Sequence, residues 1–272
     1  MNINRVILSR KGFDSAAGKQ ASPIFSDNTL FSLPIPQKRP SPNKYGDLFI
    51  NQKSGEEAFI EAGVGKNLNL DSFCHYDPMI LPEIGLFGQV GNAQGILEKR
   101  GVGVGDLFIF FGWFKKYFQK KSDCHHIFGW LQIDEIIKGS DAIINYLKTI
   151  NVEHPHGYGD LSSYSNNTLY VGTKKLVDNS IEMEIPGFGL FPKSSSELIL
   201  TNKGSSKSIW EIPFEGEISF GMEGVFMSQV TKWHDQSNNL ISSGGRGQEI
   251  VLNSKKNPAI KNWAINLISK NS

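Results

Sequence analysis

The chain has 272 residues, a net charge of +1 and 39% hydrophobic residues, which suits one compact domain over residues 1–272 with a sizeable core. It has no apolar run near the roughly 20 residues that a membrane-spanning helix needs, and its polar N-terminus lacks a secretory signal. We therefore expect a cytoplasmic protein without a membrane partner. The two cysteines, Cys74 and Cys124, are too few for a disulfide framework and are predicted to be free thiols.

The first part of the chain predicts short elements around a long irregular segment. An apolar run at residues 6–8 predicts a strand. Five prolines within residues 20–55 predict an extended loop, because proline is excluded from helix interiors and central strands. Short helices are predicted at residues 55–64 and at about 92–100, the second ended by Gly101.

The rest of the chain alternates strand and helix patterns. Residues 107–114 and 125–137 are β-forming runs joined by a basic connection, which predicts a β-hairpin. Residues 140–150 have helical apolar spacing, with Ser140 as the expected N-cap. Further strands are predicted at 168–171, 181–185, 187–191, 197–201 and 209–213, and a closing amphipathic helix at 257–269. The predicted class is α+β, with mostly antiparallel short strands and a few peripheral helices.

The stretch "SRKGFDS" ends the first strand with groups suited to binding phosphate. Arg10, Lys11 and the backbone N–H groups of a turn at Gly12 can hold a phosphate. Asp14 would then lie beside a sugar phosphate, where a carboxylate can activate water or stabilise positive charge developing on the sugar. Alternatively, Asp14 caps the following turn. The glycine spacing does not match a P-loop.

The stretch "FCHYDP" is the second candidate, because it places His75 two residues from Asp77. On a strand the two side chains would share one face. They could form an acid/base pair or bind a metal, or the histidine could simply support the loop before Pro78. Two ligands are fewer than most metal sites need, so we predict no metal.

Two further segments are candidates for substrate contact. The histidines of "HPH", His154 and His156, could line a polar pocket, bind a metal or be structural. In "SSGGRGQEIV", glycines surround Arg246, whose guanidinium could approach a phosphate, and Gln248 follows at the start of a strand.

Positive charge is concentrated towards the N-terminus. Residues 1–53 hold eight Lys/Arg and three Asp, a net +5, whereas the remainder is −4. A second basic segment, "KKYFQKK" at residues 115–121, interleaves cations with aromatic rings, as nucleic-acid surfaces do. It could equally be a solvated connection with buried rings.

Several kinds of chemistry lack their motifs in this chain. We find no G-x-S-x-G, no H-E-x-x-H and no zinc-deaminase pattern. "GVGVGD" at residues 101–106 lacks the last glycine of a dinucleotide fingerprint and precedes a strand rather than a helix. We therefore predict no cofactor.

Several motifs together resemble the family of nucleotide modification associated domains, the third of that series. They are "SRKGFDS", "LPIP", "CHYDP", "GDLFIFFGWF" with "FGWLQIDEII", "HPH", "LYVG" and "GRGQEIV". The resemblance implies a role in systems that make, read or remove modified DNA bases, notably those of phages and their hosts. The strand pair around the basic connection is also similar to pseudouridine-synthase-associated (PUA) barrels, which implies a partial PUA-like barrel.

Residue chemistry and family resemblance together favour a DNA glycosylase, a hydrolase of N-glycosidic bonds. It would excise a modified base, such as glucosylated hydroxymethylcytosine, from phage DNA and leave an abasic site, as an enzyme of antiviral defence. The alternatives are a non-enzymatic reader of modified bases, an enzyme that synthesises the modification, and a hydrolase of free nucleotides. The catalytic candidates are Asp14, Asp77 and His75, and the DNA- or substrate-binding candidates are Ser9, Arg10, Lys11, Phe13, Ser15, Tyr76, Trp113, His154, His156, Arg246 and Gln248.

Overall fold

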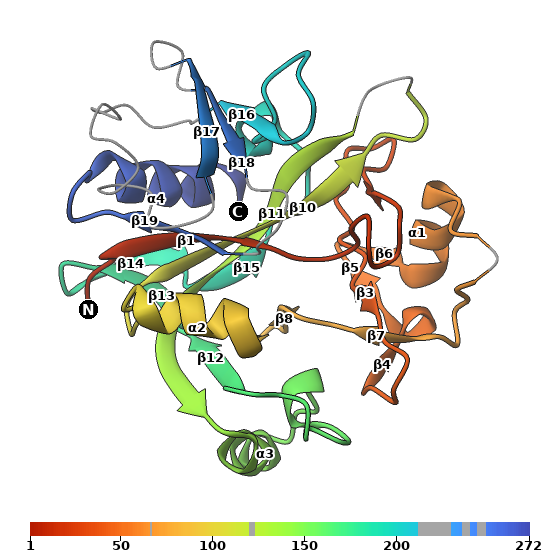
Figure 1. Ribbon diagram of the computed structural model, residues 1–272, viewed down its shortest axis with the longest axis horizontal. Helices are drawn as coiled ribbons and strands as arrows, with labels where there is room; N and C mark the ends of the chain where they lie inside the picture. The colour runs from red at the N-terminus through yellow and green to blue at the C-terminus, as the bar shows by residue number, and fades with distance from the viewer. Residues whose placement is uncertain (66, 120–122, 212–229, 236–239, 244–248) are drawn as a thin grey trace.

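A mixed nine-stranded sheet forms the centre of the molecule (Figure 1). The computed structural model describes residues 1–65, 67–119, 123–211, 230–235, 240–243 and 249–272. The order along the sheet is β19–β1–β10–β11–β12–β9–β8, with β2 beside β10 and β15 beside β11. These strands are β1 (Arg5–Arg10), β2 (Ser22–Pro23), β8 (Met79–Ile80), β9 (Gly85–Gln89), β10 (Leu107–Lys115), β11 (Cys124–Lys138), β12 (Thr168–Gly172), β15 (Phe188–Leu190) and β19 (Glu249–Asn253).

The first strand joins distant parts of the chain. β1 runs parallel to β10, with Val6 opposite Leu107, and antiparallel to β19, with Ser9 opposite Glu249. β10 and β11 pair antiparallel with one register shift, so the predicted hairpin is confirmed. Among the described strands only the ladders of β10 with β1 and β2 are parallel, which confirms the mostly antiparallel arrangement.

Residues of β10 are buried without alternation, because the sheet is covered on both faces. Leu107 to Phe111 are all at most 3% exposed. Helices α2 (Gly91–Lys99) and α4 (Ala259–Asn271) lie on either side of β1 in Figure 1, and both contribute side chains to this core. Such continuous apolar runs are typical of strands buried on both faces.

Local sequence signals account for the helix ends. α1 (Gly55–Ala62) begins with a capping box, in which Ser54 and Glu57 satisfy each other's backbone N–H groups, and ends at a left-handed Gly63. The N-cap of α3 (Ser140–Thr149) is Gly139, not the predicted Ser140. Ser140 instead accepts a hydrogen bond from Asn167 Nδ2 at 3.0 Å.

The proline-rich segment folds into a second, smaller cluster beside the sheet, at the right of Figure 1. Its strands have only two or three residues, as the prolines predict. They are β3 (Ile35–Pro36), β4 (Asn43–Lys44), β5 (Phe49–Ile50), β6 (Lys53–Ser54) and β7 (Phe73–His75), with a short 3₁₀ helix η1 (Tyr45–Asp47). Tyr45 anchors the cluster, because its buried hydroxyl donates to the Pro34 carbonyl at 2.8 Å.

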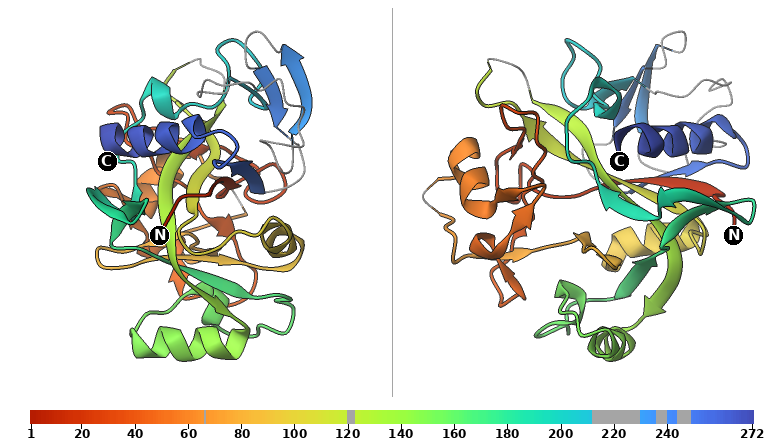
Figure 2. Two further views of the ribbon diagram at one scale, coloured as in Figure 1. Left: turned by 90° about the vertical axis from the view of Figure 1, so that its left-hand side faces the viewer. Right: turned by 180° about the vertical axis from the view of Figure 1, so that it is seen from behind.

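Two small antiparallel sheets lie outside the central sheet in the C-terminal part of the chain, seen also from two further sides in Figure 2. Residues 197–201 are not the predicted strand, because Ser196–Leu198 form the 3₁₀ helix η3. The described strands close into no barrel, so the partial PUA-like barrel stays a prediction. The helices of the described residues are too short or too polar to cross a membrane. The remaining elements are β13 (Lys175–Asp178), β14 (Ile181–Pro186), β16 (Ile209–Glu211), β17 (Val230–Asp235), β18 (Leu240–Ser243) and the 3₁₀ helix η2 (Pro155–Gly157).

Candidate functional site

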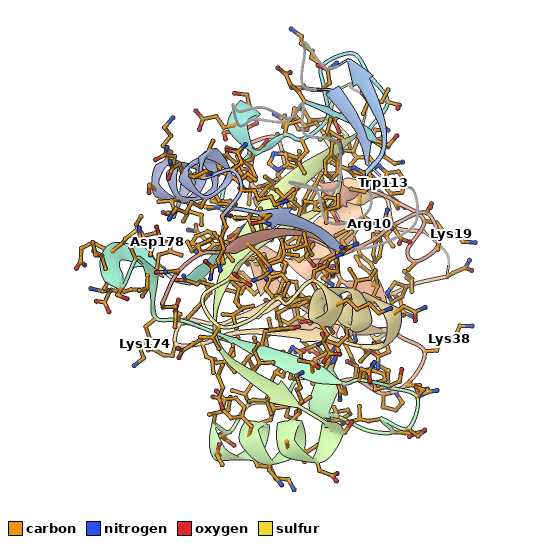
Figure 3. All side chains as sticks on the ribbon, turned by 60° about the vertical axis from the view of Figure 1, so that its left-hand side comes forward. Arg10, Lys19, Lys38, Trp113, Lys174 and Asp178 are labelled. Atoms are coloured by element: carbon orange, nitrogen blue, oxygen red, sulfur yellow. The ribbon has the colours of Figure 1, made fainter. Side chains whose placement is uncertain are left out.

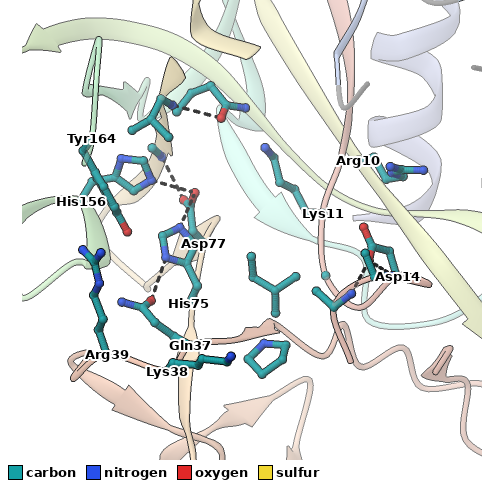
Figure 4. A pocket seen from close by; sticks show the side chains of 18 of the residues that line it. Arg10, Lys11, Asp14, Gln37, Lys38, Arg39, His75, Asp77, His156 and Tyr164 are labelled. Carbon is teal, nitrogen blue, oxygen red and sulfur yellow. Dashed lines mark hydrogen bonds and ion pairs between the residues drawn. The ribbon is translucent and has the colours of Figure 1, made fainter. Parts of the chain in front are cut away.

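A cavity of about 500 Å³ opens between the sheet and the proline-rich cluster (Figure 4). Its wall combines the loop after β1, residues 35–39 around β3, the end of β7, the end of β9 and the segment from η2 to residue 164. Four cations border it: Arg10, Lys11, Lys38 and Arg39. The basic N-terminal segment and the "CHYDP" and "HPH" motifs therefore meet at one place.

Asp77 is the buried carboxylate of this cavity. It is 9% exposed, and its Oδ1 accepts a hydrogen bond from the Gly88 backbone N–H at 2.9 Å. His154 Nε2 lies 3.4 Å from the same oxygen. One oxygen of Asp77 is thus held by the structure behind it, and the other oxygen is left for the cavity side.

Two histidines face that second oxygen. His75 Nε2 lies 3.8 Å and His156 Nε2 lies 3.7 Å from Asp77 Oδ2. The far ring nitrogen of each has its own partner: His75 Nδ1 lies 3.1 Å from Gln37 Oε1, and His156 Nδ1 lies 2.8 Å from Asn167 Oδ1. One ligand atom from each of these three residues lies within 4.8 Å of the others.

Burial and contacts set the charges of this group at neutral pH. Burial lowers the pKa of His75 to about 4 and that of His156 to about 3, despite the opposing charge of Asp77. Burial raises the pKa of Asp77, but the contact with His154 outweighs it and holds the pKa below its usual range. We therefore expect an ionised Asp77 facing neutral His75 and His156.

A second buried carboxylate, Glu249, lies behind the basic wall. Its Oε1 accepts from Ser9 Oγ at 3.0 Å, from Lys11 Nζ at 3.2 Å and from Gln89 Nε2 at 2.6 Å. Lys11 Nζ also lies 4.3 Å from the centre of the Phe87 ring. Lys11 is thus fixed at the cavity wall from both sides.

Asp14 borders the cavity but is committed to its own loop. Its Oδ1 accepts from the backbone N–H groups of Ala16 at 2.8 Å and Ala17 at 2.6 Å. Gly12 has a φ of +79°, and a Cβ there would meet the Leu33 carbonyl oxygen at 2.9 Å, so the sharp turn requires glycine. The alternative that Asp14 caps the following turn is therefore confirmed. Because Asp14 also borders the cavity, its catalytic role stays a prediction.

Several predicted contacts lie away from the cavity. Phe13 is 1% exposed and packs edge-on against Tyr45, so it is a core residue rather than an exposed ring. Ser15 is exposed outside the cavity wall. Tyr76 packs between the clusters of the core, and its pKa is raised to about 12 by burial.

The second basic segment is also elsewhere. Trp113 donates to Asp123 and lies under Lys207, whose Nζ is 3.9 Å from the ring centre. Lys115 and Lys116 border a different hollow, of about 700 Å³. Arg246 and Gln248 lie outside the described residues. Figure 3 shows Trp113 above Arg10, with Lys19 and Lys38 on the same side of the view.

The sequence reasoning missed several residues of the wall. They are Gln37, Lys38, Arg39, Gln89, Ser163 and Tyr164, together with Glu249 behind it. The basic excess of residues 1–53 was a usable signal for Lys38 and Arg39. A lone carboxylate before the apolar run "IVL" was a weaker signal for Glu249.

The fold and the site define a domain with a polar, positively bordered cavity around a buried histidine–aspartate group. The family model of nucleotide modification associated domain 3 matches residues 5–253, so the chain belongs to that family. No curated protein and no solved structure matches it. Membership connects the chain with modified nucleotides and confirms the family resemblance seen in its motifs.

Proposed function

We propose that this protein is a DNA glycosylase that excises a modified base; membership of its family supports a role with modified nucleotides. The observation that carries the proposal is Asp77, a buried carboxylate held ionised at a cavity bordered by four cations. Ionised carboxylates stabilise positive charge on a sugar ring, and cations beside them suit the flanking phosphates of DNA.

The proposed reaction is hydrolysis at the sugar carbon C1′. The C1′–N bond breaks, its electron pair leaves with the base, and the base takes up a proton. Water supplies the hydroxyl group that replaces the base at C1′. Asp77 supports the positive charge on the sugar, and we place Asp14 in a secondary role because one of its oxygens is occupied by its own loop.

The cavity suits an extruded nucleotide with a bulky substituent. Its volume of about 500 Å³ falls in the range of about 300–1,000 Å³ that is usual for small-molecule sites. Tyr164 lines it, with its ring 5.3 Å from that of His156, and offers an aromatic surface to a base. A glucosylated hydroxymethylcytosine of phage DNA is the substrate we propose.

The test compares a plain duplex with one rich in glucosylated hydroxymethylcytosine. Alkali-labile abasic sites are counted and the released molecule is analysed by mass spectrometry. We expect a free modified base from the modified duplex only, and a loss of more than about 100-fold in Asp77→Asn. Glu184→Gln is the matched control, because Glu184 is exposed and paired with Lys175 away from the cavity.

Two outcomes would overturn this assignment. Selective retention of the modified duplex with no released base would make the protein a reader of modified bases. Full activity of Asp77→Asn, with folding confirmed by circular dichroism, would remove Asp77 from the reaction.

A further inference from the structure

The tautomer of His156 is fixed by its neighbour Asn167. Asn167 Nδ2 donates to the His156 carbonyl at 2.9 Å and to Ser140 Oγ at 3.0 Å, which identifies the other amide atom as oxygen. That oxygen lies 2.8 Å from His156 Nδ1, so Nδ1 carries the proton and donates. His156 Nε2 then presents a lone pair towards Asp77 Oδ2.

His75 has the same arrangement on the opposite side. Its Nδ1 donates to Gln37 Oε1 at 3.1 Å, which leaves its Nε2 as an acceptor facing Asp77 Oδ2. Histidines that bind metals commonly donate the other ring N–H to an oxygen in this way, because the bond fixes the ring and its tautomer.

His154 has the reverse tautomer and a different role. Its Nδ1 accepts from the backbone N–H of His156 at 3.2 Å, so its proton lies on Nε2. That Nε2 faces Asp77 Oδ1 at 3.4 Å, beside the N–H of Gly88. Oδ1 therefore accepts from the Gly88 N–H and has the His154 N–H beside it, whereas Oδ2 faces two lone pairs.

Three acceptor atoms thus converge with no donor among them: His75 Nε2, Asp77 Oδ2 and His156 Nε2. A proton on one imidazole would satisfy one of these contacts, whereas a single cation satisfies all three. We propose that this trio binds one divalent first-row transition-metal ion, with His154 and Gly88 positioning the carboxylate.

The distances suit this class of ion. Metal–nitrogen and metal–oxygen bonds of about 2.1 Å let two ligands lie up to about 4.2 Å apart. The two histidine–carboxylate separations are 3.8 and 3.7 Å, within this limit. The three ligand atoms all lie within 4.8 Å of one another, so binding one ion requires the two imidazoles to close on it. Two histidines and one carboxylate favour zinc or iron(II) over magnesium or calcium, which prefer all-oxygen sites.

All three residues line the cavity, so an ion bound there would keep open coordination positions for water or substrate. A water molecule bound to such an ion is more acidic than free water, and on zinc its pKa falls to about 7. The inference goes beyond the proposed glycosylase activity and does not depend on it. With an ion bound, Asp77 Oδ2 would be a ligand rather than a free charge facing the sugar, so the ion itself would act on the modified nucleotide, in base release or in another reaction.

The test is metal binding by the full, untagged protein without DNA. After treatment with a chelator, Co²⁺ is titrated and followed by its visible absorption, and Zn²⁺ is added to compete. We expect one ion per chain, displaced by Zn²⁺, with a nitrogen–oxygen spectrum that lacks thiolate bands. Metal analysis of the protein as purified supplements the titration.

Variants then locate the site. We expect His156→Gln and Asp77→Asn to weaken Co²⁺ binding by more than about 100-fold, and Asn167→Ala to weaken it by about 10–100-fold as a supporting residue. Glu184→Gln is the control, because it makes a carboxylate-to-amide change at an exposed residue away from the cavity and should bind Co²⁺ as tightly as wild type.

Two results would overturn the proposal. One is a wild-type protein that binds neither Co²⁺ nor Zn²⁺ below about 100 µM; the other is unchanged binding in folded Asp77→Asn and His156→Gln. The wild-type spectrum gives a test that does not depend on the variants folding. Thiolate bands in it would show that a cysteine binds the ion, which would contradict the proposed site. Base release by fully chelated protein would instead leave the glycosylase standing and remove the ion from its reaction.

Discussion

The imidazole of His156 packs directly on the backbone of Gly88. A Cβ at Gly88 would lie 2.2 Å from His156 Cδ2, a distance that real atoms do not adopt. The N–H of Gly88 also donates to Asp77 Oδ1. One residue without a side chain therefore positions both the carboxylate and a histidine of the site.

Gly88→Ala should displace His156 and weaken the site. We expect metal affinity and base release to fall by about 10-fold or more, with a loss of about 1–3 kcal/mol in the free energy of unfolding through overpacking. Gly95→Ala is the control, because a Cβ there meets nothing within 4 Å and alanine favours a helix. Unchanged metal affinity and activity in Gly88→Ala would show that the close packing is not required.

Lys11→Met should destabilise the sheet edge as well as the cavity wall. It removes the ion pair between Lys11 and Glu249, whose side chains are 10% and 0% exposed. Breaking a buried pair by removing one partner costs about 3–5 kcal/mol. Denaturant unfolding measures this, and Lys175→Met, which breaks an exposed pair with Glu184, should cost less than about 1 kcal/mol. Equal losses in the two variants would contradict the assignment.

His126 should make stability fall in acid. It is buried, with Nδ1 donating to the Ile127 carbonyl and Nε2 2.9 Å from Ser194 Oγ. Burial lowers its pKa to about 4 from an ordinary 6.5, so the unfolded chain binds the proton more readily than the folded chain. This contribution is complete above pH 6.5 and is lost as the pH falls through 4, with a size on the order of 3 kcal/mol.

The measurement is urea unfolding between pH 7 and pH 4 in the presence of a chelator. His126→Gln should be less stable at pH 7 and show a flatter dependence of the unfolding free energy on pH. An equally steep dependence in a folded variant would assign the acid sensitivity to other groups.

The cations at the cavity should contribute to DNA binding mainly through phosphates. We expect Lys38→Gln and Arg39→Gln each to weaken binding to plain and modified duplexes alike, and to reduce the salt slope by about 1 if each meets one phosphate. Lys174→Gln is the control, because Figure 3 shows Lys174 on the opposite side of the view from Arg10 and Lys38. A loss confined to modified DNA would indicate contact with the modified base instead.

Much of the fold follows from local pattern. The β-forming runs at 107–114 and 125–137 are β10 and β11, and the helical spacings at 55–64 and 92–100 are α1 and α2. The strand predicted at residues 197–201 was wrong. Their apolar alternation belongs to an irregular segment, in which Leu198 and Leu200 are buried without a regular strand ladder. Tertiary burial decided that segment rather than propensity.

The site was predicted in parts but not as a whole. The spacing of His75 and Asp77 indicated a pair, and the "HPH" motif indicated a polar pocket. Their meeting depends on the pairing of β9 with β12, which brings η2 to Gly88, and such long-range pairing leaves no local pattern. Phe13 was misjudged for a related reason, since a ring in a polar loop became core once the proline-rich cluster covered it.

The position of β1 between β10 and β19 also governs how the molecule is made. Ser9 and Lys11 meet Glu249 across some 240 residues of chain. A nascent chain on the ribosome therefore carries the first strand for most of its synthesis before the partner on its outer side exists. Sheets closed by such distant segments form slowly, and their unpaired edges invite association in the meantime. We expect the folding of this protein during translation to benefit from a chaperone that shields that edge.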